Sequence, residues 1–426
     1  MELRLELEPS RMPMAVAFAE TAAREAGLGE LETGELTMSA EELFLALCSS
    51  MPGADIRLLF RNRRYAVDLL FQAPQPLSDL RIFNITSRPD LETEQGLAAI
   101  GLFLASRMCD QFDLRQLPGG RWEIMLRKDR SYPTASPLQS RFSGESCDWK
   151  VISDPPADAV AMFSALISEQ YPAAQFPENF SPAGRLLDKL ASGEYGVILA
   201  LDQQGVQAGG LIWHCSEGHI VECYGPYLNC LEGPETLLTA LCEKAAELFG
   251  RSDHHGMVLY APQAPPAAAG FDPAGNLETV NGRVWAGYRM MGEDFGAAAL
   301  VPESLMPFYT AACADLALPR DISICHYNSG QGDGLTLFST RLDRATGMAR
   351  LTPLLIGRDA GPVLDEHLHL LDSERFCTTC CVLDTGRPFD TLLVPRLLHH
   401  GFVPRLLIPW GGAGDQIHLY RVLKSR

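Results

Sequence analysis

Cysteine side chains offer the most obvious chemistry in this sequence. Cys377, Cys380 and Cys381 form the one cluster among 12 cysteines, and the first two have the C-x-x-C spacing of metal and redox sites. No second C-x-x-C pair and no following histidine completes a zinc site. The run 377–383 also has the pattern of a buried strand, in which neighbouring thiols point to opposite faces. We favour this structural interpretation and keep a thiol or metal protein as an alternative.

Histidine side chains provide a second possible source of metal ligands. Pairs occur at 254–255 and 399–400, and His367 and His369 lie on an expected helix. Metal ligands on one helix need a spacing of three or four residues, whereas these two are only two residues apart. We therefore interpret them as solvated polar side chains and predict no metal site.

Composition and charge exclude several classes of function. Of the 426 residues, 46% are apolar and 21% are charged, which is typical of a globular protein. Asp and Glu outnumber Lys and Arg by 53 to 35, and a net charge of −18 repels nucleic acid and anionic lipid. No apolar stretch approaches the roughly 20 residues of a membrane-spanning helix. Because the first residues lack the pattern of a secretory signal, we expect a cytoplasmic protein.

The elements that must position any functional residues fall into three segments. A chain of this length is expected to form two or three domains. Residues 1–130 predict an α/β sandwich with strands at 3–7, 56–60, 65–71, 113–116 and 122–127 and helices at 14–26, from Thr37 or Ser39 onward, and at 96–110. Residues 131–147 are rich in Ser, Pro and Arg and predict a linker.

The remaining sequence predicts a second α/β region in two parts. Residues 148–318 have the order strand, two helices, three strands, helix and strand, followed by an expected loop at 262–276. Residues 319–426 repeat part of that order, which suggests two similar halves. Pro395 indicates that the last helix either bends at this residue or starts near it.

Residues 1–130 resemble the small ATPase domain of bacterial anti-sigma-factor kinases, a member of the GHKL group that includes histidine kinases. The resemblance rests on the order of elements and on the segments Ser39–Leu47 and Gly96–Asp110. It implies that Glu42 orients the attacking water and that Gly96 and Gly101 receive phosphate on backbone amides at a helix start. The family has Asn four residues after the Glu to hold Mg²⁺, and this chain has Ala46 there. Kinase activity is therefore not expected, although ATP binding without Mg²⁺ stays open.

Residues 148–426 resemble GNAT acetyltransferases. The order of elements and the closing segments Leu397–Phe402 and Asp415–Tyr420 carry this resemblance. It implies acetyl-CoA as cofactor, Glu222 as general base and Tyr260, or alternatively Tyr288, as general acid. The family binds the coenzyme A pyrophosphate with a glycine-containing loop before a helix. The matching positions here are Leu231, Glu232, Gly233 and Glu235, and Pro234 between them lacks an amide proton.

In both regions, residues that the similar families use to bind phosphate groups or Mg²⁺ are missing. We use this shared loss to choose between two functions. We expect a bacterial regulatory protein in which an ATPase-like domain binds a protein partner and a catalytically impaired acyltransferase-like domain senses a ligand or acts as a scaffold. The alternative is an active N-acetyltransferase that uses acetyl-CoA and has a regulatory ATP-binding domain.

Overall fold

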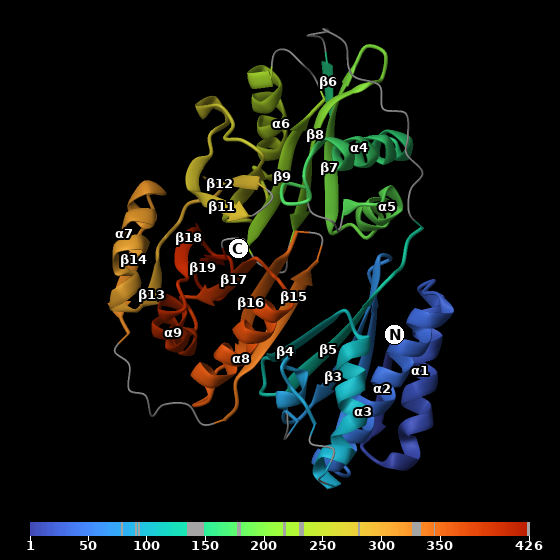
Figure 1. Cartoon of the computed structure of the whole chain (residues 1–426). Helices are drawn as coiled ribbons and strands as arrows, with labels where there is room; N and C mark the ends of the chain where they lie inside the picture. The colour runs from blue at the N-terminus through green and yellow to red at the C-terminus, as the bar shows by residue number, and fades with distance from the viewer. Residues whose placement is uncertain are drawn as a thin grey trace. The chain divides into compact units, whose positions relative to one another are not determined.

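The structure, a computed structural model, has an α/β fold throughout, as the sequence predicts (Figure 1). It describes residues 1–77, 80–89, 92, 94–133, 149–176, 180–215, 219–229, 234–279, 282–325, 334–344 and 346–423. The chain forms two compact units that each combine separate segments. Unit 1 comprises Met1–Tyr132, Ser329–Arg341 and Leu351–Glu374, and unit 2 comprises Pro133–Asn328, Leu342–Arg350 and Arg375–Arg426.

Unit 1 contains a five-stranded antiparallel sheet with the helices of residues 12–50 and 94–108 packed against one face. The strand order is β1-β2-β3-β5-β4. The strands are β1 (Glu2–Glu6), β2 (Asp55–Asn62), β3 (Ala66–Ala73), β4 (Gln111–Gln116) and β5 (Trp122–Asp129). The helices are η1 (Pro9–Arg11), α1 (Met12–Glu25), α2 (Glu30–Ser50), η2 (Leu80–Phe83), α3 (Glu94–Met108) and α8 (Ala360–Ser373).

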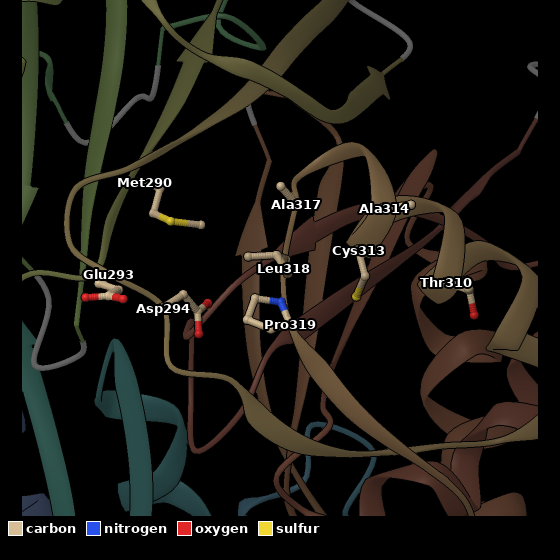
Figure 2. A pocket seen from close by; sticks show the side chains of 9 residues that line it. All are labelled: Met290, Glu293, Asp294, Thr310, Cys313, Ala314, Ala317, Leu318 and Pro319. Atoms are coloured by element: carbon tan, nitrogen blue, oxygen red, sulfur yellow. The ribbon is translucent and has the colours of Figure 1, made fainter.

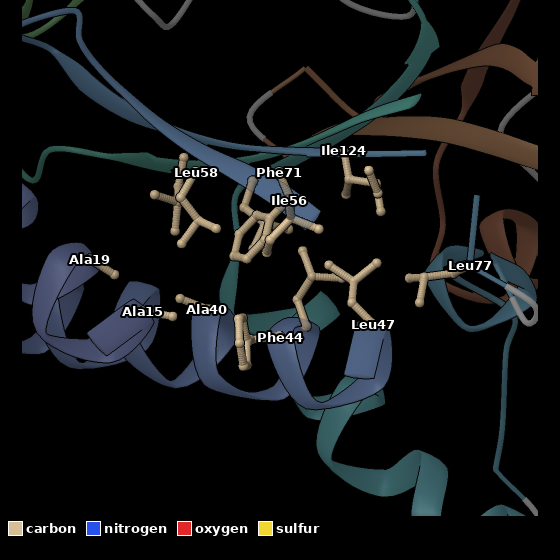
Figure 3. Close-up of a cluster of buried hydrophobic side chains, with 14 of the residues drawn as sticks. Ala15, Ala19, Ala40, Phe44, Leu47, Ile56, Leu58, Phe71, Leu77 and Ile124 are labelled. Carbon is tan, nitrogen blue, oxygen red and sulfur yellow. The ribbon is translucent and has the colours of Figure 1, made fainter. Parts of the chain in front are cut away.

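Alternating apolar residues of the strands build the core of unit 1 against the helices (Figure 3). Ile56 and Leu58 on β2 point from one face of the sheet toward Phe44 and Leu47 on α2. The same cluster contains Leu337, from a segment that lies far along the chain. Because this side chain is fully buried, the core of unit 1 is completed by residues outside the first 132.

Helix α2 is longer than the sequence interpretation allows. It begins at Glu30, so the expected start at Thr37 or Ser39 is wrong. Leu36, Ala40 and Leu43 are all buried, which continues one helical face through the expected start. Ser39 does not cap the helix, because its hydroxyl donates to backbone carbonyls of Glu35 and Ala105.

Most of unit 2 is built on a twelve-stranded sheet of order β15-β16-β17-β19-β18-β11-β12-β10-β9-β8-β7-β6, whose strands β15 and β16 are divided between the two units. The strands of its first half are β6 (Trp149–Ile152), β7 (Tyr195–Asp202), β8 (Gln207–Cys215), β9 (Ile220–Leu228), β10 (Gly256–Ala261), β11 (Asp272–Thr279) and β12 (Gly282–Met290). Those of the second half are β15 (Leu337–Asp343), β16 (Met348–Leu355), β17 (Thr378–Asp384), β18 (Val403–Ile408) and β19 (Gln416–Val422). In the first half, the last strand β12 lies between β11 and β10, and β10 follows the helix of residues 234–249. In the second half, the last strand β19 lies between β18 and β17, and β17 follows α8. The strand order therefore repeats.

Helices cover both faces of the first half of this sheet. Helices α4 (Ala157–Gln170) and α5 (Ala183–Ala191) pack on one face, and α6 (Pro234–Phe249) packs on the other. Between β9 and α6 lies the loop that the acyltransferase resemblance singles out. Outside this sheet, β13 (Ala297–Val301) and β14 (Arg320–Ile324) form a parallel pair, and α7 (Met306–Asp315) lies between them in the chain.

The two halves of the sheet join where β11 pairs with β18 through Gly275 and Leu406. A Cβ atom at position 275 would overlap the carbonyl oxygen of Arg405, so only glycine permits this close approach. The sequence interpretation assigned residues 262–276 to a loop, and it is wrong for the part that forms β11. Pro273 and Gly275 weaken the local strand pattern, but a β-bulge accommodates both residues.

Two further expectations are confirmed in the second half. Helix α9 (Val394–His399) starts close to Pro395 after a 3₁₀ helix, η6 (Pro388–Leu393), so the start near this proline is the correct alternative. Residues 378–384 form the buried strand β17. Across the described ranges, no helix has both the length and the apolar character needed to span a membrane.

Candidate functional site

A row of polar side chains crosses three neighbouring strands on one face of unit 2. Tyr195 on β7 lies opposite His214 on β8, and His214 lies opposite Glu222 on β9. Directly paired residues share a face of the sheet. Tyr224 lies two residues beyond Glu222 and therefore on the same face. This is the face that α4 and α5 cover, because Tyr195 and Tyr224 pack against their apolar cluster.

Glu222 is held as a carboxylate by the groups around it. The Tyr224 hydroxyl donates to Glu222 Oε2 at 2.8 Å, and His214 Nδ1 lies 3.8 Å from the same oxygen. Burial would raise the pKa of Glu222, but His214, Tyr224 and the charge of Arg350 together lower this pKa to about 2. The side chain nevertheless keeps 30% of its surface exposed, so it is accessible to a small molecule.

Tyr260 lies on the strand next to that of Glu222. The parallel ladder of β9 and β10 pairs Tyr260 with Tyr224, and their rings stack with centroids 5.4 Å apart. Burial and the negative charge of Glu222 raise the pKa of Tyr260, so its phenol stays protonated. Tyr288 lies elsewhere: its ring covers Gly256, and its buried hydroxyl has no hydrogen-bond partner among the described residues.

The second half of unit 2 contributes polar groups that interact electrostatically with this row. Arg350 on β16 influences the pKa of Glu222 and of Tyr260. His418 on β19 is fully buried, and its Nδ1 has no hydrogen-bond partner in the described part of the chain. Burial and the charge of Arg350 lower the pKa of His418 to about 3, which keeps this imidazole neutral. Groups from both halves of unit 2 therefore interact electrostatically with Glu222.

Beyond Tyr224, β9 no longer pairs with β10, so this edge of β9 is free. A side chain from another segment bonds main-chain groups of that edge. The ladder ends at Tyr224 and Tyr260, and a bulge follows in β9 opposite Gly210 and Ile212. The Tyr171 hydroxyl, at the end of α4, accepts from the amide of Leu228 at 2.9 Å and donates to its carbonyl at 3.2 Å. Pro226 has no amide proton to offer. An incoming amide chain thus finds these main-chain groups of β9 occupied or absent.

The loop expected to bind coenzyme A lies mostly outside the described residues, which exclude Leu231, Glu232 and Gly233. Glu235 is exposed in the first turn of α6. A carboxylate there stabilises the helix terminus but repels a phosphate that approaches the same amides. The preceding Asn229 is buried and uses its side chain to bond Gln170 and Gln207.

In unit 1 the structure brings two of the predicted nucleotide residues together. A Cβ atom at Gly101 on α3 would overlap the carboxylate of Glu42 on α2. Burial and the neighbouring charge of Glu41 raise the pKa of Glu42. Gly96 lies in the first turn of α3, where amides have no partner within the helix. Gly101 lies farther along, where the amide of a regular helix bonds the preceding turn.

The cysteine and histidine clusters have structural surroundings. Cys380 and Cys381 are fully buried on β17, and burial raises the pKa of both thiols, which suppresses thiolate chemistry. The interpretation of His367 as a solvated side chain is wrong, because it is fully buried in unit 1. Its Nδ1 lies 2.7 Å from the carbonyl of Val363, and its ring lies near Phe338. Among the described residues, no three His, Cys, Asp or Glu side chains form a metal-binding group.

A separate buried ion network supports the second half of unit 2. Arg320 bonds Asp294 and, through two nitrogens, Asp415. The Tyr309 hydroxyl donates to the same Asp415 at 2.6 Å. Figure 2 shows the adjoining pocket of about 660 Å³, whose wall is largely apolar. The pocket is lined by Met290, Glu293, Asp294, Thr310, Cys313, Ala314, Ala317, Leu318 and Pro319. Because Asp294 is already paired, this network serves the packing of α7 and β14.

Sequence reasoning missed three residues at the site around Glu222. His214 and Tyr171 occupy ordinary strand and helix-end positions, and nothing in their local sequence indicates their partners. Arg350 does carry a signal, because it interrupts a run of apolar residues within a strand (Met348–Leu355). A charged side chain in such a run is rarely buried without a partner or a function.

Comparison with known proteins first gives a class: over about a third of the chain the structure is similar to acetyltransferases. No family model and no curated protein matches the sequence. The similar structures include an aminoglycoside 6′-acetyltransferase type Ii, at 13% identity, over 34% of this chain and 98% of that chain, with a TM-score of 0.27. A ribosomal-protein-S5-alanine acetyltransferase from Vibrio fischeri matches at 14% identity, over 34% and 94%, with a TM-score of 0.27. A GNAT superfamily phosphinothricin acetyltransferase from Sinorhizobium meliloti matches at 17% identity, over 34% and 89%, with a TM-score of 0.26.

Proposed function

We propose that the protein is a regulator in which unit 2 binds a small molecule without transferring an acyl group. The observation that carries this proposal is the Tyr171 hydroxyl, which occupies both main-chain groups of Leu228 on the open edge of β9. The pantetheine arm of acetyl-CoA contains amides that need such groups as partners. Without them, burying the arm would leave its amides unpaired, at a cost of about 1–3 kcal/mol each.

The electrostatics around Glu222 support binding over catalysis. A general base works best when its pKa lies near the working pH. The pKa of Glu222 is about 2, so this carboxylate gains little by accepting a proton from an ammonium group. It can, however, hold a cation in place at any physiological pH. The acyltransferase-like unit thus retains a charged binding group without an effective base.

For unit 1 we propose a partner-binding role instead of nucleotide hydrolysis. Glu42 places a carboxylate against α3, and its raised pKa reflects burial and Glu41 without a compensating cation. A triphosphate at this position would add like charge to an uncompensated site. Ala46 replaces the Mg²⁺ ligand of the similar family, so no metal offsets that repulsion.

Thermal unfolding of the full chain with acetyl-CoA, and separately with ATP and Mg²⁺, tests both parts. At ligand concentrations of about 1 mM we expect no rise in Tm, because a ligand that does not bind the native state cannot stabilise it. A release assay for free coenzyme A thiol, run with a mixture of primary amines, should stay at the background rate. The Glu222→Gln variant provides the control for residual turnover.

The competing function, an active N-acetyltransferase, makes the opposite prediction. Acetyl-CoA would raise Tm by several degrees, and thiol release would depend on Glu222. That outcome would overturn the proposed role of unit 2. A rise in Tm with ATP that requires Mg²⁺ would overturn the proposed role of unit 1.

A further inference from the structure

Glu222 on β9 and Arg350 on β16 carry opposite charges and interact electrostatically, but they form no ion pair. Met348, two residues before Arg350, packs with Cys380 and Tyr420, so Arg350 lies on their side of the sheet. The strand pairing from Tyr260 to His418 places Tyr260 on this side too. We give the name polar face to six partly exposed side chains: Tyr195, His214, Glu222, Tyr224, Tyr260 and Arg350. The hydrogen-bonding and ion-pair partners of Glu222 are Tyr224 and His214. The Arg350 guanidinium forms no side-chain hydrogen bond or ion pair with any residue that the structure describes.

An arginine whose guanidinium has no hydrogen-bond or ion-pair partner is expected to bind an anion. The guanidinium has five N–H donors in a planar fork, and that fork fits the two oxygens of a carboxylate. Removing a cation from water without a partner costs free energy, so such groups are normally paired. The neighbouring side chains of the second half supply no negative charge to this guanidinium, because His418 is neutral and Cys380 keeps its proton. The partner that fits is a carboxylate from outside the chain.

The opposite end of the polar face suits an ammonium group. Glu222 supplies a permanent negative charge with part of its surface exposed. The stacked rings of Tyr224 and Tyr260 lie next to it, and the faces of aromatic rings attract cations. Tyr260 also has a hydroxyl without a hydrogen-bond partner among the described residues. The aromatic walls thus stabilise a cation that Glu222 attracts.

We propose that the polar face binds a zwitterionic small molecule, with its ammonium group at Glu222 and its carboxylate at Arg350. A polyanion such as a phosphate ester would be repelled by Glu222, and a simple amine would be repelled by Arg350. A molecule with one charge of each sign satisfies both groups at once. The proposal names the class of ligand for the small-molecule site of unit 2, so it rests on the proposed function.

Calorimetric titration of the full-length protein with linear ω-amino acids tests the proposal. The series runs from glycine through β-alanine and γ-aminobutyrate to ε-aminocaproate, so it varies only the distance between the two charges. We expect one chain length to bind best. The alkylamine and the alkyl carboxylate of that length should each bind at least roughly tenfold more weakly, because each satisfies only one of the two charged groups.

Four variants separate recognition from folding. Arg350→Met and Glu222→Gln should each reduce the affinity for the best ω-amino acid by roughly tenfold or more. Arg350→Met should also make the alkylamine bind more tightly, since it removes the repelling charge. The controls Arg251→Met and Glu243→Gln alter exposed residues of the same unit and should leave the affinity unchanged. The gain for the alkylamine cannot result from misfolding, so it keeps the test decisive.

Two outcomes would overturn the proposal: no member of the series binds, or the singly charged analogues bind as tightly as the ω-amino acids. These outcomes are separable from failure of the proposed function. If the protein binds acetyl-CoA and transfers its acyl group to an ω-amino acid, the regulator is refuted and the zwitterion site stands. If neither acetyl-CoA nor any ω-amino acid binds, the zwitterion site is refuted and the absence of acyl transfer stands.

Discussion

At the scale of single residues, Asp390 occupies an unfavourable position for a charge. Its side chain is buried in η6, accepts the amide of Asp384 at 3.2 Å, and lies 3.5 Å from Arg387. Burial raises the pKa of Asp390 to about 7 from 3.8, and the charge of Asp384 adds to the effect. The folded protein therefore binds this proton more tightly than the unfolded chain does. Stability is retained below the unfolded pKa and declines as the pH rises toward 7.

Asp390→Asn should remove that decline, because the amide keeps an acceptor oxygen and cannot ionise. We expect the variant to exceed wild type by about 2–4 kcal/mol in free energy of unfolding at pH near 8, and by little at pH near 4. Denaturant unfolding across this pH range measures the difference. The exposed Asp315→Asn substitution is the control and should follow wild type. An equal gain at both pH values would contradict the titration argument.

Residue chemistry was predictable at this site, but residue proximity was not. The acyltransferase resemblance singled out Glu222 and Tyr260, and the structure places them on neighbouring strands. Their electrostatic interaction with Arg350 depends on a distant strand whose position no local pattern indicates. Tyr171 bonds the edge of β9 through its hydroxyl, and the local sequence at this helix end does not predict those bonds. Long-range pairing decides these contacts, and one sequence carries little information about it.

At the scale of elements, the junction of β11 with β18 depends on the absence of one side chain. Gly275 faces Leu406, and the Arg405 carbonyl occupies the space where a Cβ would lie. A backbone carbonyl cannot rotate away as a flexible side chain can. Any larger residue must therefore separate the two strands.

Gly275→Ala should lower the free energy of unfolding by about 1–3 kcal/mol, which is typical of overpacking at a rigid contact. Gly34→Ala is the matched control, because position 34 lies within α2 and nothing surrounds an added Cβ. That substitution should be stabilising by up to about 1 kcal/mol, as expected for alanine in a helix. Denaturant midpoints of both variants provide the comparison. Equal effects from the two alanines would argue against a steric junction.

Periodic elements were predicted well, and elements with mixed signals were not. The alternation in β2 and the buried run of β17 are strong patterns, and both strands were expected. Helix α2 extends N-terminal of its expected start because a buried face continues there, and Ser39 offered a competing capping signal. Strand β11 contains proline and glycine, which favour loops until a bulge and a neighbouring strand accommodate them.

At the scale of the whole molecule, unit 1 depends on segments distant in sequence. Leu337 is fully buried in its core, and Leu335, Leu354 and Leu355 pack against the same cluster. Asn84 bonds the main chain of Thr336 and of Phe338 through its side-chain amide. Local sequence patterns favour contiguous domains and cannot reveal such a composite unit.

A fragment of residues 1–132 should fold less completely than the same residues in the full chain. Its core would lack Leu337 and expose the apolar side chains that this residue covers. We expect increased binding of a hydrophobic dye and a weak near-ultraviolet circular dichroism signal. Joining residues 329–374 to the fragment through a flexible linker should restore both properties. A fully cooperative, dye-free fragment would show that these segments are dispensable.

The chain passes between its two units five times, after residues 132, 328, 341, 350 and 374. A single cleavage after residue 132 or after residue 374 therefore keeps all segments of one unit on one fragment, but that fragment also carries segments of the other unit. Degradation that starts in one unit removes segments that the other needs. Inheritance follows the same rule: recombination at one point of the gene that passes on one unit intact also passes on part of the other, so neither unit is inherited alone.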